Sequence, residues 1–145
     1  MKLTNQDIWL AYPELVKMGG GKLNGETHTG MKMPVEASLG IAKLIGKLRI
    51  AYLKIEQERV RLVKKYGRLN DENSMYFVSP ENADYALEFA SLLVREWDEE
   101  FEFEKVKLPQ TVKNICESCG TEMDVVFRIE ANSLIPLVEH FVEVI

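Results

Sequence analysis

Residues 34–67 of this 145-residue chain read PVEASLGIAKLIGKLRIAYLKIEQERVRLVKKYG and contain its longest regular pattern. Apolar or aromatic side chains recur there at intervals of four and three residues, interrupted by Arg59, at Ile41, Ile45, Leu48, Tyr52, Ile55, Leu62 and Tyr66. This spacing is typical of a long helix whose apolar side packs against another helix. Pro34 suits the first turn and Gly67 suits the end, so we expect one helix within residues 34–68.

A second helix is predicted over residues 79–99. Ser79, Pro80 and Glu81 supply an N-cap, a proline for the first helical position and an early acid. An apolar side then follows at Ala86, Phe89, Ala90, Leu93 and Trp97. Because the connection is short, we expect residues 34–68 and 79–99 to pack as an antiparallel helical hairpin.

The N-terminal residues 1–18 predict a capped helix. Thr4 and Asp7 have the spacing of a capping box, and Pro13 is expected to break or restart the helix. Three consecutive glycines then end it. Residues 19–33 are polar and without a period, which indicates a loop or hairpin, and we assign them as a loop.

The C-terminal residues 100–145 alternate between apolar and polar side chains, as at Phe101 and Phe103 and again at Val125, which predicts half-buried strands. Ser133 is placed to cap a terminal apolar helix. The whole chain, 1–145, is therefore expected to be a single domain of the α+β class. Helices dominate this expected fold, which ends in a small C-terminal antiparallel sheet.

Charge is distributed unevenly along the chain, which has a net charge of −5. Residues 34–68 carry nine Lys or Arg against three Glu, whereas residues 69–145 carry five Lys or Arg against seventeen Asp or Glu. These two regions can neutralise each other, or they can face a partner or a second copy. The lack of a net basic excess argues against nucleic-acid binding, and no window is apolar enough for a membrane span.

A row of basic residues recurs every seven positions along the first predicted hairpin helix, at Lys47, Lys54, Arg61 and Arg68. Residues at this spacing share one side of a helix, so the row is a candidate surface for phosphates, an acidic partner or the acidic half of this chain. The alternative is an ordinary solvated helix surface. We expect a protein partner, or self-association through the long helix.

Two cysteines lie in the sequence CESCG, at Cys116 and Cys119. A C-x-x-C-G turn is half of a zinc ribbon, but a closed zinc site needs four ligands and no second such pair is present. A four-cysteine site shared by two chains, a redox pair and a plain turn with reduced thiols remain open, and we favour the plain turn. We therefore expect no cofactor, with zinc at Cys116 and Cys119 as the alternative. No catalytic set of residues can be assembled, and we expect no enzymatic activity.

Four segments of the chain carry a resemblance to a known family. They are MKLTNQDI at 1–8 with AYP at 11–13, MPVEAS at 33–38 with AK at 42–43, an E-R-x-x-L-x-x-KYG pattern at 58–67, and an L-x-x-L-x-E pattern at 134–139. In these segments the chain resembles a family of small, functionally uncharacterised proteins of tailed phages and prophages of Gram-positive bacteria. The family has no agreed activity and no catalytic residues to carry over.

The resemblance implies a phage gene product. We expect a non-enzymatic protein that acts through protein–protein contacts, in the virion or in its assembly. The alternatives are a host-directed inhibitor or anti-defence protein that binds a bacterial enzyme, and a zinc-stabilised binding module. The N-terminal residues lack the apolar core of a signal peptide, so the expected location is the cytoplasm of the infected host or the virion.

Overall fold

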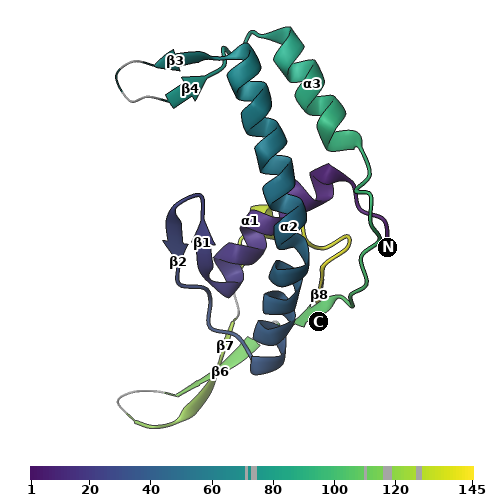
Figure 1. The fold of residues 1–145 in the computed structure, drawn as a ribbon. Helices are drawn as coiled ribbons and strands as arrows, with labels where there is room; N and C mark the ends of the chain where they lie inside the picture. The colour runs from purple at the N-terminus through teal and green to yellow at the C-terminus, as the bar shows by residue number, and fades with distance from the viewer. Residues whose placement is uncertain (71, 73–74, 110, 116–118, 127–128) are drawn as a thin grey trace. The chain divides into compact units, whose positions relative to one another are not determined.

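The computed structural model describes residues 1–70, 72, 75–109, 111–115, 119–126 and 129–145, with the backbone alone for 111–115 and 122–126. Helices dominate this part of the chain, as predicted, and the described strands form four two-stranded sheets. The elements in Figure 1 are α1 (Asn5–Gly19), β1 (Gly21–Leu23), β2 (Glu26–His28), α2 (Val35–Tyr66), β3 (Arg68–Asn70), β4 (Met75–Phe77), α3 (Ala83–Val94), β5 (Val106–Leu108), β6 (Thr111–Ile115), β7 (Glu122–Val126), α4 (Ala131–Leu134) and β8 (Val142–Val144). None of the helices within these residues combines the length and the apolar character that crossing a bilayer requires.

The chain divides into two compact units, each with buried apolar side chains. The α3 unit comprises Met1–Trp9 and Leu48–Phe101, and the β5 unit comprises Leu10–Lys47 and Glu102–Ile145. The largest fully buried side chains of the α3 unit are those of Leu3, Ile8, Leu48 and Ile55. Those of the β5 unit are Leu15, Val16, Ile41, Leu44, Leu108, Leu137, Phe141 and Val142.

Helix α1 begins with the predicted capping box. The backbone N–H of Thr4 donates to the Asp7 carboxylate at 2.9 Å, and the backbone N–H of Asp7 donates to the Thr4 hydroxyl at 3.1 Å. The prediction that Pro13 interrupts the helix is wrong, because α1 continues through it to Gly19. Proline removes one backbone hydrogen bond, but the buried Tyr12 and Leu15 on either side keep the helical backbone in place.

Helix α2 matches its prediction within two residues at each end. Five of its seven predicted apolar positions are buried, and Ile45 and Tyr66 are half-buried. In the α3 unit, α2 contacts α1 through the Trp9 indole, which donates to Glu56 at 2.8 Å. In the β5 unit, Gly19 of α1 lies directly against Ile41 and Ile45 of α2. The residues that the spacing selected therefore do form the buried side of the helix.

The prediction that the next helix starts at Ser79 is wrong, because α3 starts four residues later. Ser79 instead caps a turn, in which its carbonyl accepts from the backbone N–H of Asn82 at 3.0 Å and its hydroxyl accepts from that of Glu81 at 3.3 Å. Pro80 occupies the second position of this turn, where its fixed φ is favoured. Asn82 is the true N-cap, since its side chain accepts from the backbone N–H of Tyr85 at 3.0 Å.

Helix α3 also ends earlier than predicted, at Val94 rather than 99. Its next residues pair with the N-terminal residues of the same unit: Asn5 donates its backbone N–H to Arg95 at 2.8 Å, and Trp97 donates to Leu3 at 2.8 Å. These backbone hydrogen bonds require extended backbone, and Arg95 has φ −69° and ψ 141°. Tertiary pairing therefore ends the helix where the sequence allows it to continue.

Side-chain contacts link α3 to the second half of α2, beside which it lies in Figure 1. Glu88 of α3 accepts hydrogen bonds from Tyr66 at 2.8 Å and from Lys65 at 3.1 Å. Tyr85 stacks on Phe89 with ring centroids 5.9 Å apart, and Tyr66 meets Tyr85 edge-on at 6.5 Å. The two predicted hairpin helices are therefore in contact, and their antiparallel direction stays a prediction.

Residues 19–33 contain a β-hairpin, which is the alternative to the loop predicted from their polar composition. Strands β1 and β2 pair antiparallel around Asn24 and Gly25, whose φ values are 51° and 84°. Asparagine followed by glycine is the usual pair for two positive φ angles in a two-residue hairpin turn. A second hairpin, β3–β4, follows α2 directly and places Arg68 opposite Phe77.

The sheet that ends the chain is parallel where the sequence predicted it antiparallel. Strand β5 pairs with β8 in parallel, with Val106 opposite Val142. The residues between them, which include the β6–β7 hairpin and α4, are long enough for the crossover that a parallel pair requires. The β6–β7 hairpin itself is antiparallel. Phe101 and Phe103 alternate with exposed glutamates as predicted, but strand pairing begins only at Val106.

The predicted terminal helix is shorter and starts earlier than expected. Helix α4 covers Ala131–Leu134, with Glu130 rather than Ser133 at its N-cap. Pro136 has no N–H to continue the helical hydrogen bonds, and the chain goes on as turns to Phe141. Both Leu137 and Phe141 remain fully buried.

Candidate functional site

Three of the four residues of the predicted basic row lie on α2, at Lys47, Lys54 and Arg61. Lys47 belongs to the β5 unit and donates to the backbone carbonyl of Glu102. Lys54 and Arg61 belong to the α3 unit, where the Lys54 ammonium lies 5.7 Å from the Trp97 ring and Arg61 forms an ion pair with Glu58 at 3.0 Å. Each of these three cations thus has a partner within its own unit.

Arg68 departs from the row because it lies in β3, beyond the end of α2 at Tyr66. A seven-residue spacing keeps residues on one side only while the helix continues, and the helix stops two residues too early. Binding of a partner by Lys47, Lys54, Arg61 and Arg68 stays a prediction.

Cys116 and Cys119 lie in the sequence between β6 and β7. Cys116 is outside the described residues, and Cys119 is an exposed free thiol. Among the residues that the structure describes, no cluster of three or more His, Cys, Asp or Glu side chains is arranged around a common point. The zinc alternative at Cys116 and Cys119 stays open.

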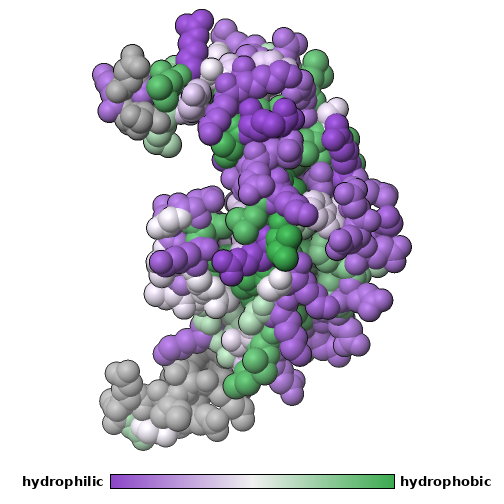
Figure 2. Space-filling model, in the orientation of Figure 1, coloured by the Kyte–Doolittle hydropathy of each residue, from purple (hydrophilic) through white to green (hydrophobic). Residues whose placement is uncertain are grey.

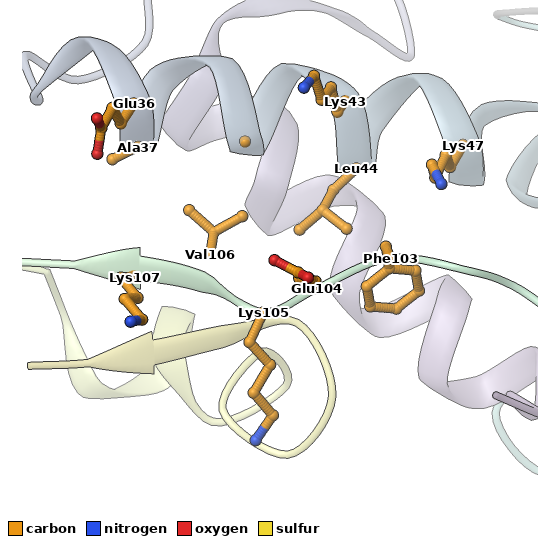
Figure 3. Close-up of a pocket in the computed structure, with 11 residues that line it drawn as sticks. Glu36, Ala37, Lys43, Leu44, Lys47, Phe103, Glu104, Lys105, Val106 and Lys107 are labelled. Carbon is orange, nitrogen blue, oxygen red and sulfur yellow. The ribbon is translucent and has the colours of Figure 1, made fainter.

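A groove of about 480 Å³ lies in the β5 unit between α2 and the segment 103–107. Figure 3 shows Leu44 and Val106 pointing toward each other across it, with Glu104 directed at the helix. Leu44 and Val106 are buried, whereas Phe103 is half-buried and stacks on Phe141 at 5.5 Å. The floor of the groove is therefore apolar.

Charged side chains of both signs surround this groove. Lys43 and Lys47 come from α2, whereas Lys105 and Lys107 point to the other side of the strand (Figure 3). Lys105 donates to the carbonyl of Val138 at 3.2 Å. The lining residues include neither a hydroxyl, a thiol nor an imidazole. The apolar floor and the charged rim of this groove suit an apolar side chain flanked by polar groups.

A smaller cavity of about 170 Å³ in the α3 unit is lined by Asn5, Lys54 and Trp97 among others. The Asn5 side chain is buried and donates to the carbonyl of Leu92 at 2.9 Å, while its Oδ1 has no donor within the described residues. A buried carbonyl oxygen of this kind is commonly satisfied by a bound water.

The groups with shifted pKa values lie in the α3 unit and hold it together. Burial alone would raise the pKa of Glu56, but hydrogen bonds from Arg59 and Trp9 lower it below its usual value. The pKa of Glu88 is likewise lowered by its hydrogen bonds from Tyr66 and Lys65. Both carboxylates accept hydrogen bonds from side chains of their own unit.

Helix α3 carries a surface that sequence analysis did not identify. It has two charged residues in twelve, yet none of its residues is buried. Its outward side consists of Ala83, Leu87, Ala90 and Val94, all exposed, with Leu87 at 69% and Val94 at 68%. We call these four residues the outer face of α3.

The sequence had assigned Ala86 and Ala90 to the buried side of this helix, and both are exposed. The half-buried side instead centres on Tyr85, Phe89 and Leu92. A helix that is apolar on all sides normally lies in a core, so the composition of α3 was the sequence signal for this exposed apolar surface.

The β3–β4 hairpin of the same unit adds exposed apolar side chains, which Figure 2 shows as green surface beside the grey residues. Leu69, Met75, Tyr76 and Phe77 are all exposed. Leu69 and Tyr76 pair on one face of the hairpin, and Met75 and Phe77 lie on the other. No protein-family model matches this chain, and neither a curated protein nor a solved structure is significantly similar to it.

Proposed function

We propose that this chain is a non-enzymatic phage protein that works through protein–protein contacts, as a component of the virion or of its assembly, and that the outer face of α3 is its contact surface. The observation that carries the proposal is a helix whose apolar residues point both inward and outward while none is buried. Phage origin rests on the four sequence segments that resemble the phage family.

The two sides of α3 have different roles in this proposal. The inner side is held by Tyr85 and Phe89, whose rings stack, and Phe89 meets Trp9 edge-on at 5.3 Å. Glu88 adds an ion pair to Lys65 of α2 at 3.1 Å. Because the inner side is anchored, the outer face is presented in a defined orientation, which reduces the entropy cost of binding.

Leaving the outer face in water is unfavourable. Full burial of a leucine or valine side chain stabilises a protein or complex by about 1.5–3 kcal/mol. Leu87 and Val94 are mostly exposed, so most of this stabilisation is absent in the isolated chain. A partner that covers both side chains recovers it.

The test follows the protein through infection. We expect mass spectrometry to find the chain at a fixed copy number in purified virions or in assembly intermediates. Leu87→Ser should lower the yield of particles, because it removes the centre of the outer face. Leu53→Ser is the matched control, since Leu53 is also exposed, on α2 of the same unit, and should leave the yield unchanged.

Other outcomes would assign the alternatives. Absence from particles and intermediates, together with a stable complex with a bacterial enzyme, would overturn the assembly role in favour of a host-directed inhibitor. Stoichiometric zinc that is lost in Cys116→Ser would instead indicate the zinc-stabilised module.

A further inference from the structure

The outer face of α3 is complementary to a second copy of itself. Ala83, Leu87, Ala90 and Val94 follow one another at intervals of four, three and four residues, the spacing of a stripe that packs against another helix. The opposite side is occupied by the stacked Tyr85 and Phe89, so this stripe is the side of α3 that remains open to a partner.

The order of small and large residues determines what fits this stripe. Along the helix the order is small, large, small, large. When a second α3 runs in the opposite direction, Leu87 lies opposite Ala90 of the second copy, and Val94 lies opposite Ala83. Every large side chain then lies opposite a small one. This arrangement lets two helices approach closely, because each large side chain fills the space beside the small one.

The residues that flank the stripe fit the same register. On one flank Ala86 lies opposite Leu93 of the second copy, again small against large. On the other flank Asp84 lies opposite Ser91, a carboxylate acceptor against a hydroxyl donor. All of these are exposed except Leu93, which is half-buried. No like charges oppose each other, and antiparallel alignment also pairs the helix dipoles favourably.

We propose that the chain associates as a two-fold symmetric dimer through antiparallel pairing of α3 with α3 of a second copy. This inference rests on the proposed function, because it names the partner of the same outer face. It also replaces the long helix, which the sequence favoured for self-association, with the shorter one. A helix of twelve residues spans about 18 Å, so the paired helices form a small interface of the weak, reversible class.

Analytical ultracentrifugation of the full chain over a range of concentrations tests the pairing. We expect a reversible monomer–dimer equilibrium. Leu87→Ala should raise the dimer dissociation constant about tenfold or more, because each dimer loses two leucine contacts. Leu53→Ala, the same truncation at an exposed α2 position, should leave it unchanged. The double variant Leu87→Ala/Ala90→Leu exchanges the opposed residues, and should bring the constant back toward that of the unaltered chain.

Cross-linking tests the direction of the helices. Two variants are made in a chain that already carries Cys116→Ser and Cys119→Ser. One carries Ala83→Cys and the other carries Val94→Cys. A short bis-maleimide should link the two variants when they are mixed. It should not link either variant to itself, because equivalent residues at the ends of antiparallel α3 helices lie about 16 Å apart along the axis.

A chain that is monomeric at every concentration would overturn the dimer, and so would a dimer that Leu87→Ala does not weaken. Cross-linking of Ala83→Cys to itself would show parallel helices and would overturn the register. If the chain is monomeric while Leu87→Ser still lowers particle yield, the outer face binds a different protein, and the proposed function stands without the second copy.

Discussion

Arg59 donates two hydrogen bonds to the carboxylate of Glu56 one helical turn away, of 2.9 Å from Nε and 3.0 Å from Nη2. The Trp9 indole adds a third hydrogen bond at 2.8 Å and so ties α1 to the same carboxylate. Burial favours the neutral acid, but these three donors favour the anion more, and the pKa of Glu56 is lowered from 4.5. The interruption that Arg59 makes in the apolar pattern of α2 is therefore a structural ion pair.

This lowered pKa predicts a dependence of stability on pH. A carboxylate whose folded pKa is below its unfolded value contributes stability that is present above the unfolded value and is lost as pH falls through the folded value. We expect the urea unfolding free energy to fall below pH 4.5, the unperturbed value for Glu56. Glu56→Gln should cost about 1–3 kcal/mol at pH 7, and less in acid. Glu58→Gln, which alters an exposed pair, should cost at most about 1 kcal/mol.

Leu48 is fully buried on α2 and tests whether the apolar spacing marks the core. Leu48→Ala should lower the unfolding free energy by roughly 2–5 kcal/mol, because it removes buried atoms and leaves a cavity. Leu53→Ala alters an exposed leucine five residues further on, and should change stability by less than about 0.5 kcal/mol. Similar losses for both variants in denaturant melts would contradict the assigned buried side.

Two glycines of α2 in the β5 unit predict opposite effects of the same substitution. A Cβ on Gly46 meets nothing within 4 Å, so Gly46→Ala should stabilise the protein by about 0.5–1 kcal/mol through lower backbone entropy. A Cβ on Gly40 would lie 2.8 Å from a methyl group of Val106. Gly40→Ala should therefore bring no gain, or a loss of about 1–3 kcal/mol. Thermal melts of the two single variants give the comparison, and equal shifts would show that Val106 does not contact the helix.

The capping box of α1 should contribute measurably to stability. Thr4→Ala removes the acceptor for the Asp7 N–H and should cost about 0.5–2 kcal/mol. Gln6→Ala changes an exposed side chain in the same turn and should stay within about 0.5 kcal/mol. A stability loss for Gln6→Ala as large as that for Thr4→Ala would show that the loss does not come from the capping hydrogen bond.

Replacement of both cysteines by serine should leave folding and oligomeric state almost unchanged, because the plain turn needs neither thiol. Circular dichroism and ultracentrifugation check this expectation. Metal analysis that finds about half a zinc per chain, lost together with a dimer in the double variant, would indicate a four-cysteine site shared between two chains.

Local patterns in the sequence determined the parts of this fold that depend on neighbouring residues. The spacing of Ile41, Leu48 and Ile55 predicted the buried side of α2, and Thr4 with Asp7 predicted the start of α1. Each of these features is encoded within a few residues, because helical periodicity and capping hydrogen bonds join residues that are close along the chain.

Only the tertiary structure decided the remainder. Serine and asparagine are both good caps, and the sequence could not say that Ser79 caps a turn while Asn82 caps α3. The end of α3 depends on pairing with residues near the N-terminus, and the parallel direction of β8 depends on the path of the whole crossover. Which apolar side of α3 remains uncovered depends on where Tyr85 and Phe89 find aromatic neighbours. The last three of these features depend on contacts between residues distant in the chain, and no local pattern contains the energy of such contacts.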